Sequence, residues 1–269
     1  MKISLSISPC PNDTFMFDAM LNWRIDTEGL EFNAAFHDIE VLNSRLMSDS
    51  DRPQISKASY AIIPQIASRY CALRSGSALG RGNGPLLVAK NHDTRTDDSS
   101  LRIAIPGIHT TANMLLSRLF PKLTDKHPYL FSDIPDTVAA GECDAGVLIH
   151  EGRFVFRRYG LSLIADLGEE WEKATGLPLP LGVIVADRTL PEGVAEKVER
   201  ILRRSIEYAF ANPEVSLPFI REHAQEMDEE VIRKHIALFV NDYSLDIGTA
   251  GTDAVTALLD MPAEAVFRQ

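Results

Sequence analysis

The chain has 269 residues, of which 45% are hydrophobic and 24% charged. Its net charge of −11 argues against a general affinity for nucleic acids or anionic membranes. No apolar run approaches the roughly 18 residues that a membrane span needs. We therefore expect neither a nucleic acid nor a membrane as a partner. The three cysteines are scattered and form no CxxC pair, which favours reduced thiols and a cytoplasmic protein.

The first strand is predicted over residues 1–8, where polar and apolar side chains alternate instead of forming the apolar core of an export signal. Two prolines end this strand, and Asn12, Asp13 or Thr14 can cap a helix from Phe15 to about Trp23. The unpaired N–H groups of a helix start can bind an anion. This corner is therefore either simple capping or a ligand site that includes Asn12.

A second corner of this kind is expected at the end of a strand over residues 54–59. Lys57 and Ser59 lie there, ahead of another helix. Lys57 can be a solvated charge and Ser59 a helix cap, or both can bind a ligand. Before this corner, a strand over residues 29–36 leads to a helix that Asp38 caps.

The glycine-rich stretch Gly80–Gly84 superficially resembles a phosphate-binding loop. A dinucleotide fingerprint requires a strand before the glycines and a helix after them. Here residues 85–89 read as a strand, so we expect no nucleotide site.

A third corner follows a strand predicted over residues 101–105. Thr110 and Thr111 place two hydroxyls at the start of a helix over residues 112–120. The charged stretch 91–100 just before it is a natural crossing between two lobes.

His150 follows the apolar run Ala145–Ile149, which is typical of a buried strand of a parallel sheet. Ligands of open α/β sheets bind outside the carboxyl ends of the strands. The imidazole of His150 can exchange a proton near neutral pH, or it can simply make a structural hydrogen bond.

Strands over residues 161–167 and 182–186, a second crossing at 187–193 and a series of helices complete the chain. The helices are expected at 171–175, 194–210, 215–225, 229–240 and 252–259. His223 and His235 lie on charged helices and are predicted to be solvated. No HExxH, paired-histidine or Cys/His spacing predicts a metal site, and no GxSxG motif predicts a serine hydrolase.

Five motifs together resemble one family. They are Ser8–Phe15, Lys57–Ser59, Arg74–Gly82, His109–Thr111 and Ile149–Phe154. Through them the chain resembles the 1,4-dihydroxy-6-naphthoate synthases, late lyases of the futalosine route to menaquinone. The match runs in order from the first strand to the last helices, without a departure at the motif positions.

The resemblance implies an α/β protein with the two-lobed, type II periplasmic-binding-protein-like fold, in which helices flank mixed, mainly parallel sheets. The two crossings found in the sequence would be its hinges. They would separate a discontinuous lobe, residues 1–89 and 189–269, from a lobe of residues 90–188 that carries the catalytic histidine.

The resemblance also implies an activity. Cyclic dehypoxanthine futalosine would be cleaved to 1,4-dihydroxy-6-naphthoate with release of a three-carbon fragment, without a cofactor or metal. The family's proposed base maps onto His150. Substrate contacts map onto the turn formed by Lys57, Ala58 and Ser59, and onto Thr110 and Thr111.

Two other functions stay open from the sequence. A chorismate dehydratase of the same fold and pathway also handles a cyclic carboxylate, although the His-Glu-Gly-Arg segment argues against it. A non-catalytic protein that binds small carboxylates would carry an export signal or a lipid anchor, and neither is expected from this sequence. All three functions have a small-molecule carboxylate as ligand, and none predicts an oligomeric state.

Overall fold

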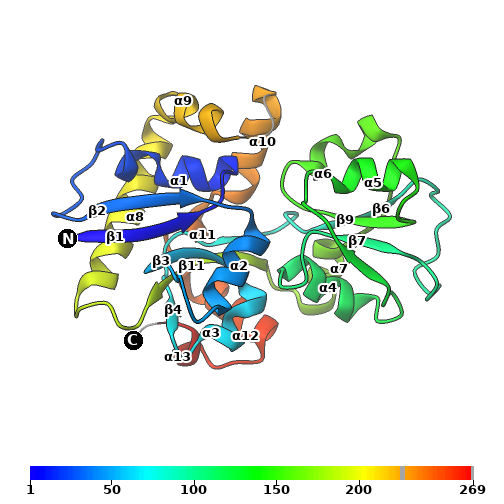
Figure 1. Cartoon of the computed structure of the whole chain (residues 1–269), viewed down its shortest axis with the longest axis horizontal. Helices are drawn as coiled ribbons and strands as arrows, with labels where there is room; N and C mark the ends of the chain where they lie inside the picture. The colour runs from blue at the N-terminus through cyan, green and yellow to red at the C-terminus, as the bar shows by residue number, and fades with distance from the viewer. Residues whose placement is uncertain (225–227, 268–269) are drawn as a thin grey trace. The chain divides into compact units, whose positions relative to one another are not determined.

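The computed structural model describes residues 1–224 and 228–267. The chain divides into two compact units, and Figure 1 shows the elements of each. The first unit consists of Met1–Gly80 and Pro180–Gln269, and the second of Arg81–Leu179. Within the described residues, no helix has both the length and the apolar character that crossing a bilayer demands.

The first unit combines a six-stranded sheet with most of the helices of the chain. Its strands are β1 (Lys2–Ile7), β2 (Glu31–Phe36), β3 (Ile55–Ser59), β4 (Tyr70–Ala72), β5 (Ala78–Gly80) and β11 (Leu179–Asp187). Its helices are α1 (Pro11–Leu21), α2 (Ile39–Met47), η1 (Tyr60–Ile62), α3 (Ile63–Ile66), α8 (Val194–Ala211), α9 (Pro213–His223), α10 (Glu229–Phe239), α11 (Asp242–Leu245), α12 (Gly248–Leu259) and α13 (Ala263–Val266).

The sheet of this unit has the strand order β2-β1-β3-β11-β4, and β5 pairs with β11. Strands β1, β2 and β3 are parallel, whereas β11 runs antiparallel to β3 and β4. A segment from the second half of the chain therefore completes a sheet that begins with the N-terminal strand, as the blue and yellow-green arrows of Figure 1 show.

The second unit is built around a smaller, five-stranded sheet. Its strands are β6 (Leu86–Ala89), β7 (Ile103–Ile105), β8 (Lys126–Pro128), β9 (Ala145–Leu148) and β10 (Ser162–Asp166). Its helices are α4 (Thr111–Leu119), α5 (Ile134–Ala140), α6 (Gly152–Val155), η2 (Phe156–Tyr159) and α7 (Leu167–Thr175). The strand order is β10-β6-β9-β7-β8, in which β7, β8 and β9 are parallel and β6 and β10 antiparallel to their neighbours.

Helix α1 is buried on nearly every side, which explains why its polar residues need partners inside the protein. All residues from Pro11 to Met20 are buried. The Asp18 carboxylate, for example, accepts hydrogen bonds from Asn22 Nδ2 at 2.7 Å and Ser216 Oγ at 2.7 Å, and pairs with Arg24 Nε at 3.1 Å. A helix in this position cannot solvate its polar side chains, so each of them is committed to a fixed contact.

Most of the predicted elements are present with shifted ends. Helix α1 begins at Pro11 instead of Phe15, because proline fits the first helical position and Cys10 precedes it as the cap residue. Asp38 caps α2 as predicted and accepts from Glu40 N at 2.9 Å. The end of the helix predicted over 215–225 lies outside the described residues.

The two predicted crossings lie inside the units. Residues 91–100 connect β6 to β7 within the second unit, and residues 187–193 connect β11 to α8 within the first. The chain changes unit at 80/81 and 179/180. The lobes proposed from the sequence, 1–89 with 189–269 and 90–188, stay a prediction.

Candidate active site

The predicted site residues lie at the end of, or after, parallel strands that are neighbours in each sheet. In the first unit β1 and β3 lie side by side, so the Asn12 corner and the Lys57–Ser59 segment are at the same edge. In the second unit β7 and β9 are adjacent and parallel, so the Thr110–Thr111 segment and His150 also follow one edge. These edges are the carboxyl ends of the strands, where α/β sheets bind ligands.

Asp13, in the first turn of α1, is the centre of the polar cluster in the first unit. Its Oδ2 accepts hydrogen bonds from Ser8 N at 3.1 Å and Ser8 Oγ at 2.8 Å. Its Oδ1 accepts from Asn12 Nδ2 at 3.0 Å and lies 3.0 Å from Lys57 Nζ. Four contacts thus occupy the lone-pair directions of a carboxylate that is fully buried.

Lys57 contributes a buried positive charge, since its side chain is only 6% exposed. The predicted alternative of a solvated lysine is wrong. Breaking a buried ion pair by removing one partner typically costs about 3–5 kcal/mol, so Lys57 and Asp13 stabilise each other's charge. Asp13 is not the helix cap that the sequence also allows: Cys10 is at the N-cap position, without a side-chain cap hydrogen bond, and Asp13 is the counter-ion of Lys57.

Ser59, the last residue of β3, is fixed by a side chain from α2. Its backbone N–H donates to Asn43 Oδ1 at 2.9 Å, and Asn43 Nδ2 donates to Ser59 Oγ at 2.9 Å. Ser59 occupies the N-cap position of η1 as predicted, but its side chain makes no cap hydrogen bond. Asn43 occupies the acceptor side of the hydroxyl, so the hydroxyl proton is directed elsewhere. The preceding residue, Ala58, is buried in the sheet opposite Val183.

The amide of Asn12 is engaged at both ends. Nδ2 donates to Asp13, and Oδ1 lies 3.0 Å from His235 Nε2. His235 is fully buried, so the prediction that it is solvated is wrong. Its position three and four residues from the buried Ile232 and Phe239 could have identified it, because that spacing forms one helix face.

In the second unit, Thr110 caps α4. Its Oγ1 donates to Gly107 O at 2.9 Å and accepts from Asn113 N at 3.2 Å. Both Thr110 and Thr111 are buried. The hydroxyl proton of Thr110 is thus used within the protein, which distinguishes this residue from Ser59.

His150 lies two residues beyond the end of β9 in a left-handed backbone conformation, with φ of 51°. A non-glycine residue with positive φ is uncommon and carries strain that functional sites often contain. The imidazole is half-buried and packs against the ring of Phe131, with centroids 4.9 Å apart and an edge-to-face angle of 68°. Phe131 therefore limits where the imidazole can lie.

Arg153 fixes the turn that carries His150. Its guanidinium donates to Gly84 O at 2.7 Å and pairs with Asp166 at 3.3 Å. Burial lowers the pKa of Arg153, and the carboxylate of Asp166 opposes that shift. The glycine-rich stretch thus has a packing role: a Cβ on Gly84 would lie 2.3 Å from the backbone of Gly168.

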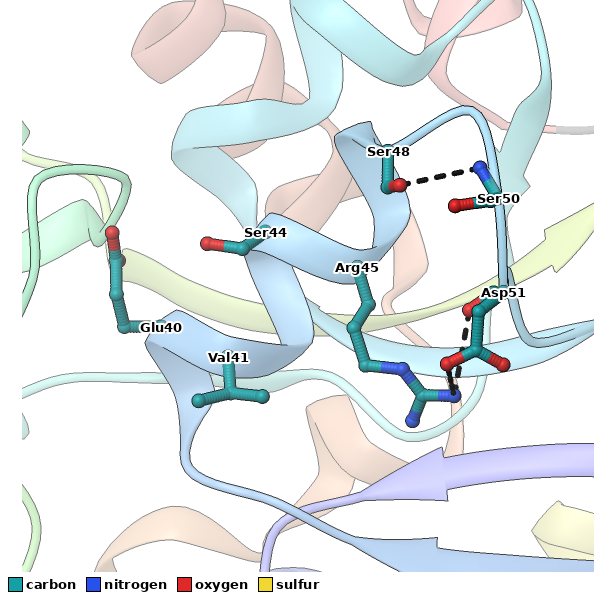
Figure 2. Close-up of a pocket in the computed structure, with 7 residues that line it drawn as sticks. All are labelled: Glu40, Val41, Ser44, Arg45, Ser48, Ser50 and Asp51. Atoms are coloured by element: carbon teal, nitrogen blue, oxygen red, sulfur yellow. Dashed lines mark hydrogen bonds and ion pairs between the residues drawn. The ribbon is translucent and has the colours of Figure 1, made fainter.

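Two hollows in the first unit lie away from these residues. Figure 2 shows one of about 360 Å³ along α2, in which Arg45 turns toward Asp51 and pairs with it at 3.2 Å. Its other lining residues include Glu40, so carboxylates offset its single arginine. A second hollow of about 450 Å³ is lined by the first residues of β1 and β2, at the edge opposite to the predicted site. Neither hollow is lined by a predicted site residue.

Across residues 1–224 and 228–267, three or more His, Cys, Asp or Glu side chains nowhere gather in a way that could hold a metal ion. Two sets of candidate side chains are present, one in each unit. In the first unit they are Asn12, Asp13, Lys57 and Ser59, and in the second Thr110, Thr111 and His150.

Similarity to solved structures gives the class of the protein: it has the periplasmic-binding-protein fold. A Candida albicans protein described as having the generic form of that fold superposes with a TM-score of 0.67 at 14% identity, covering 97% of this chain and 91% of that one. A crystal structure from Archaeoglobus fulgidus is more similar. It has a TM-score of 0.89 and 34% identity, and covers 98% of this chain and 97% of its own.

Sequence relatives then give the family. A family model described as menaquinone biosynthesis matches residues 3–264. A Thermus thermophilus protein named 1,4-dihydroxy-6-naphthoate synthase is 45% identical over 99% of this chain and 94% of its own length. One of the same name from Streptomyces coelicolor is 39% identical over 97% of this chain and 93% of its own. The chain belongs to this menaquinone biosynthesis family, and it is an enzyme of that pathway.

Proposed function

We propose that this enzyme is a carbon–carbon lyase that converts cyclic dehypoxanthine futalosine to 1,4-dihydroxy-6-naphthoate. The observation that carries the proposal is the 45% and 39% sequence identity, over nearly the full length, to two relatives named for that product. The chorismate dehydratase and the non-catalytic binding protein have no comparable support.

His150 is the proposed general base. Cleavage with aromatisation requires that a proton be removed from the substrate and that a departing oxygen be managed, and one imidazole can serve both steps in turn. The support is chemical and geometric: the imidazole follows the carboxyl end of β9, and its position is restricted by Phe131 and by a strained backbone. Positioned acid–base catalysis typically contributes about 10²–10⁴-fold in rate.

The carboxylate of the substrate is proposed to bind Lys57 and Ser59. Lys57 supplies a buried cation in a protein whose net charge of −11 otherwise opposes an anion. Ser59 supplies a hydroxyl proton that Asn43 leaves available. Ala58 would border the ligand along β3, and Asn12 would contribute its backbone N–H in the first turn of α1.

Thr110 and Thr111 are also proposed to contact the substrate. Because the Thr110 hydroxyl donates to Gly107, the contribution of this corner would come chiefly from the N–H groups at the start of α4. Such groups favour a negative charge, which agrees with a carboxylate ligand.

Product formation by the purified chain tests the function. We expect 1,4-dihydroxy-6-naphthoate to accumulate, identified by mass, when cyclic dehypoxanthine futalosine is supplied without added cofactor. Chorismate supplied in its place should stay unchanged. Dehydration of chorismate with no reaction of the futalosine derivative would assign the sister activity, and binding of both without turnover would indicate a carrier.

A further inference from the structure

A chain of buried polar side chains links α10 to the ammonium of Lys57. The chain runs from His235 through Asn12 and Asp13 to Lys57, and each of its three contacts measures 3.0 Å. All four residues are at most 5% exposed. His235 is more than 220 residues from Asn12 in sequence, so only the folded structure brings it to the N-terminal corner.

The direction of the hydrogen bonds follows from the chemistry of each group. The carboxylate of Asp13 can only accept, so Asn12 presents its NH₂ group to it. The carbonyl oxygen of Asn12 then faces His235 Nε2, which must carry a proton to donate to it. His235 therefore fixes the amide in the one orientation that donates to Asp13.

Lys57 ends the chain in a confined position. A Cβ on Gly182, which lies across from Ser59 on β11, would come within 2.9 Å of Lys57 Cε, so the lysine side chain passes directly over that glycine. Among the described residues, no hydrogen bond of suitable geometry satisfies the ammonium, whose contact with Asp13 is an ion pair. An ammonium has three N–H donors, so the donors of Lys57 that do not face Asp13 can bind an anionic acceptor from outside the protein.

We infer that His235 and Asn12 are positioning residues for substrate binding, which hold Asp13 and, through it, aim the Lys57 ammonium at the anionic group of the substrate. This inference rests on the proposed function and extends it, because it adds a residue of α10 that does not touch the ligand. Four contacts on Asp13 keep the carboxylate from rotating, and a carboxylate that cannot rotate keeps the ammonium in one place.

A purely structural role would have a different signature. A buried network that only supports the core lowers stability when it is cut, and leaves the kinetic constants of the remaining folded enzyme unchanged. Cutting a network that aims a binding group raises KM and leaves kcat nearly unchanged, because the lost interaction stabilises the bound substrate and the transition state equally.

The test compares steady-state kinetics of His235→Leu with those of His235→Gln. Leucine removes the donor to Asn12, whereas glutamine keeps an N–H₂ group of similar reach. His92→Leu is the control, since His92 is exposed and lies in the other unit. We expect KM to rise roughly tenfold in His235→Leu with kcat within about twofold of the wild type, and the glutamine variant to recover most of the loss.

A double variant gives a second readout. If His235 acts through Asn12, adding His235→Leu to Asn12→Ala should raise KM no further, because the pathway is already cut. Should the leucine variant fail to fold, His235→Met removes the donor with a more adaptable side chain.

An unchanged KM in a folded His235→Leu protein, or effects of the two substitutions that multiply, would overturn the inference and leave the proposed function intact. Absence of any turnover by the wild type would overturn the proposed function, and the inference would fall with it.

Discussion

At the scale of single residues, the two candidate hydroxyls differ in where their protons go. Asn43 donates to Ser59 Oγ, and in the part of the chain that the structure describes the Ser59 hydroxyl has no acceptor of its own. Thr110 instead donates to Gly107 O and caps α4. The sequence suggested the same role for both residues, and the hydrogen bonds separate them.

We therefore expect different outcomes for Ser59→Ala and Thr110→Val. Ser59→Ala should weaken substrate binding by about 1–3 kcal/mol, because a charged acceptor loses a donor in a confined site. Thr110→Val should weaken it less, and should lower the free energy of unfolding by about 0.5–2 kcal/mol through loss of the cap. Calorimetric titration and urea unfolding of both variants measure the two effects. Equal losses of affinity would show that the hydroxyl geometry does not decide which residue binds the substrate.

At the scale of secondary-structure elements, the turn after β9 depends on contacts with two other segments, the glycine-rich stretch at 80–84 and the start of α7. Arg153 joins this turn to Gly84 and Asp166, and Gly84 lies against Gly168 at the start of α7. The glycine-rich stretch at 80–84 is thus needed for close backbone packing, which explains glycine there without a nucleotide.

Substituting Gly84 tests this packing. A Cβ at Gly84 would lie 2.3 Å from backbone atoms of Gly168, which cannot move aside cheaply, whereas a Cβ at Gly152 would meet only Leu148 at an ordinary 3.6 Å. Gly84→Ala should lower the free energy of unfolding by about 1–3 kcal/mol or more, as overpacked cores do. Gly152→Ala should change it by less than about 0.5 kcal/mol. Equal unfolding midpoints in urea for the two variants would contradict the packing argument.

Helices, strands and the junctions between them were predictable where neighbouring residues in the sequence determine them. Proline, asparagine and threonine at strand ends mark turns and helix starts, and the corners at Asn12, Ser59 and Thr110 are all present. Three-residue strands such as β4 and β8 were missed, because so short a run has no period to detect.

The side-chain pairs of the site could not be predicted from sequence. The ion pair between Lys57 and Asp13 depends on β3 lying beside β1, and the contact of His235 with Asn12 depends on how α10 packs on α1. The many charged residues of α10 also led to the prediction that His235 is solvated, although it lies on the buried apolar face of this helix. Pairings of this kind are set by tertiary structure, which local patterns do not encode.

At the scale of the whole molecule, the fold alone leaves the function open. The same architecture occurs in proteins described as binding components of transport systems, so the activity must be argued from the site and from close relatives. In this chain the site residues include a histidine in a left-handed turn and a buried lysine paired with Asp13. We propose that the protein turns its ligand over and that His150 is the base of the reaction.

Product formation by the wild type and by His150→Asn, compared at saturating cyclic dehypoxanthine futalosine, tests this proposal. Asparagine is the appropriate replacement, because it tolerates the left-handed conformation at φ of 51° and lacks a group that titrates. We predict that the wild type forms 1,4-dihydroxy-6-naphthoate, and that the variant binds substrate within about threefold of the wild type while its turnover falls by at least about 10²-fold. Near-normal turnover by the folded variant would contradict the assignment of His150 as the base.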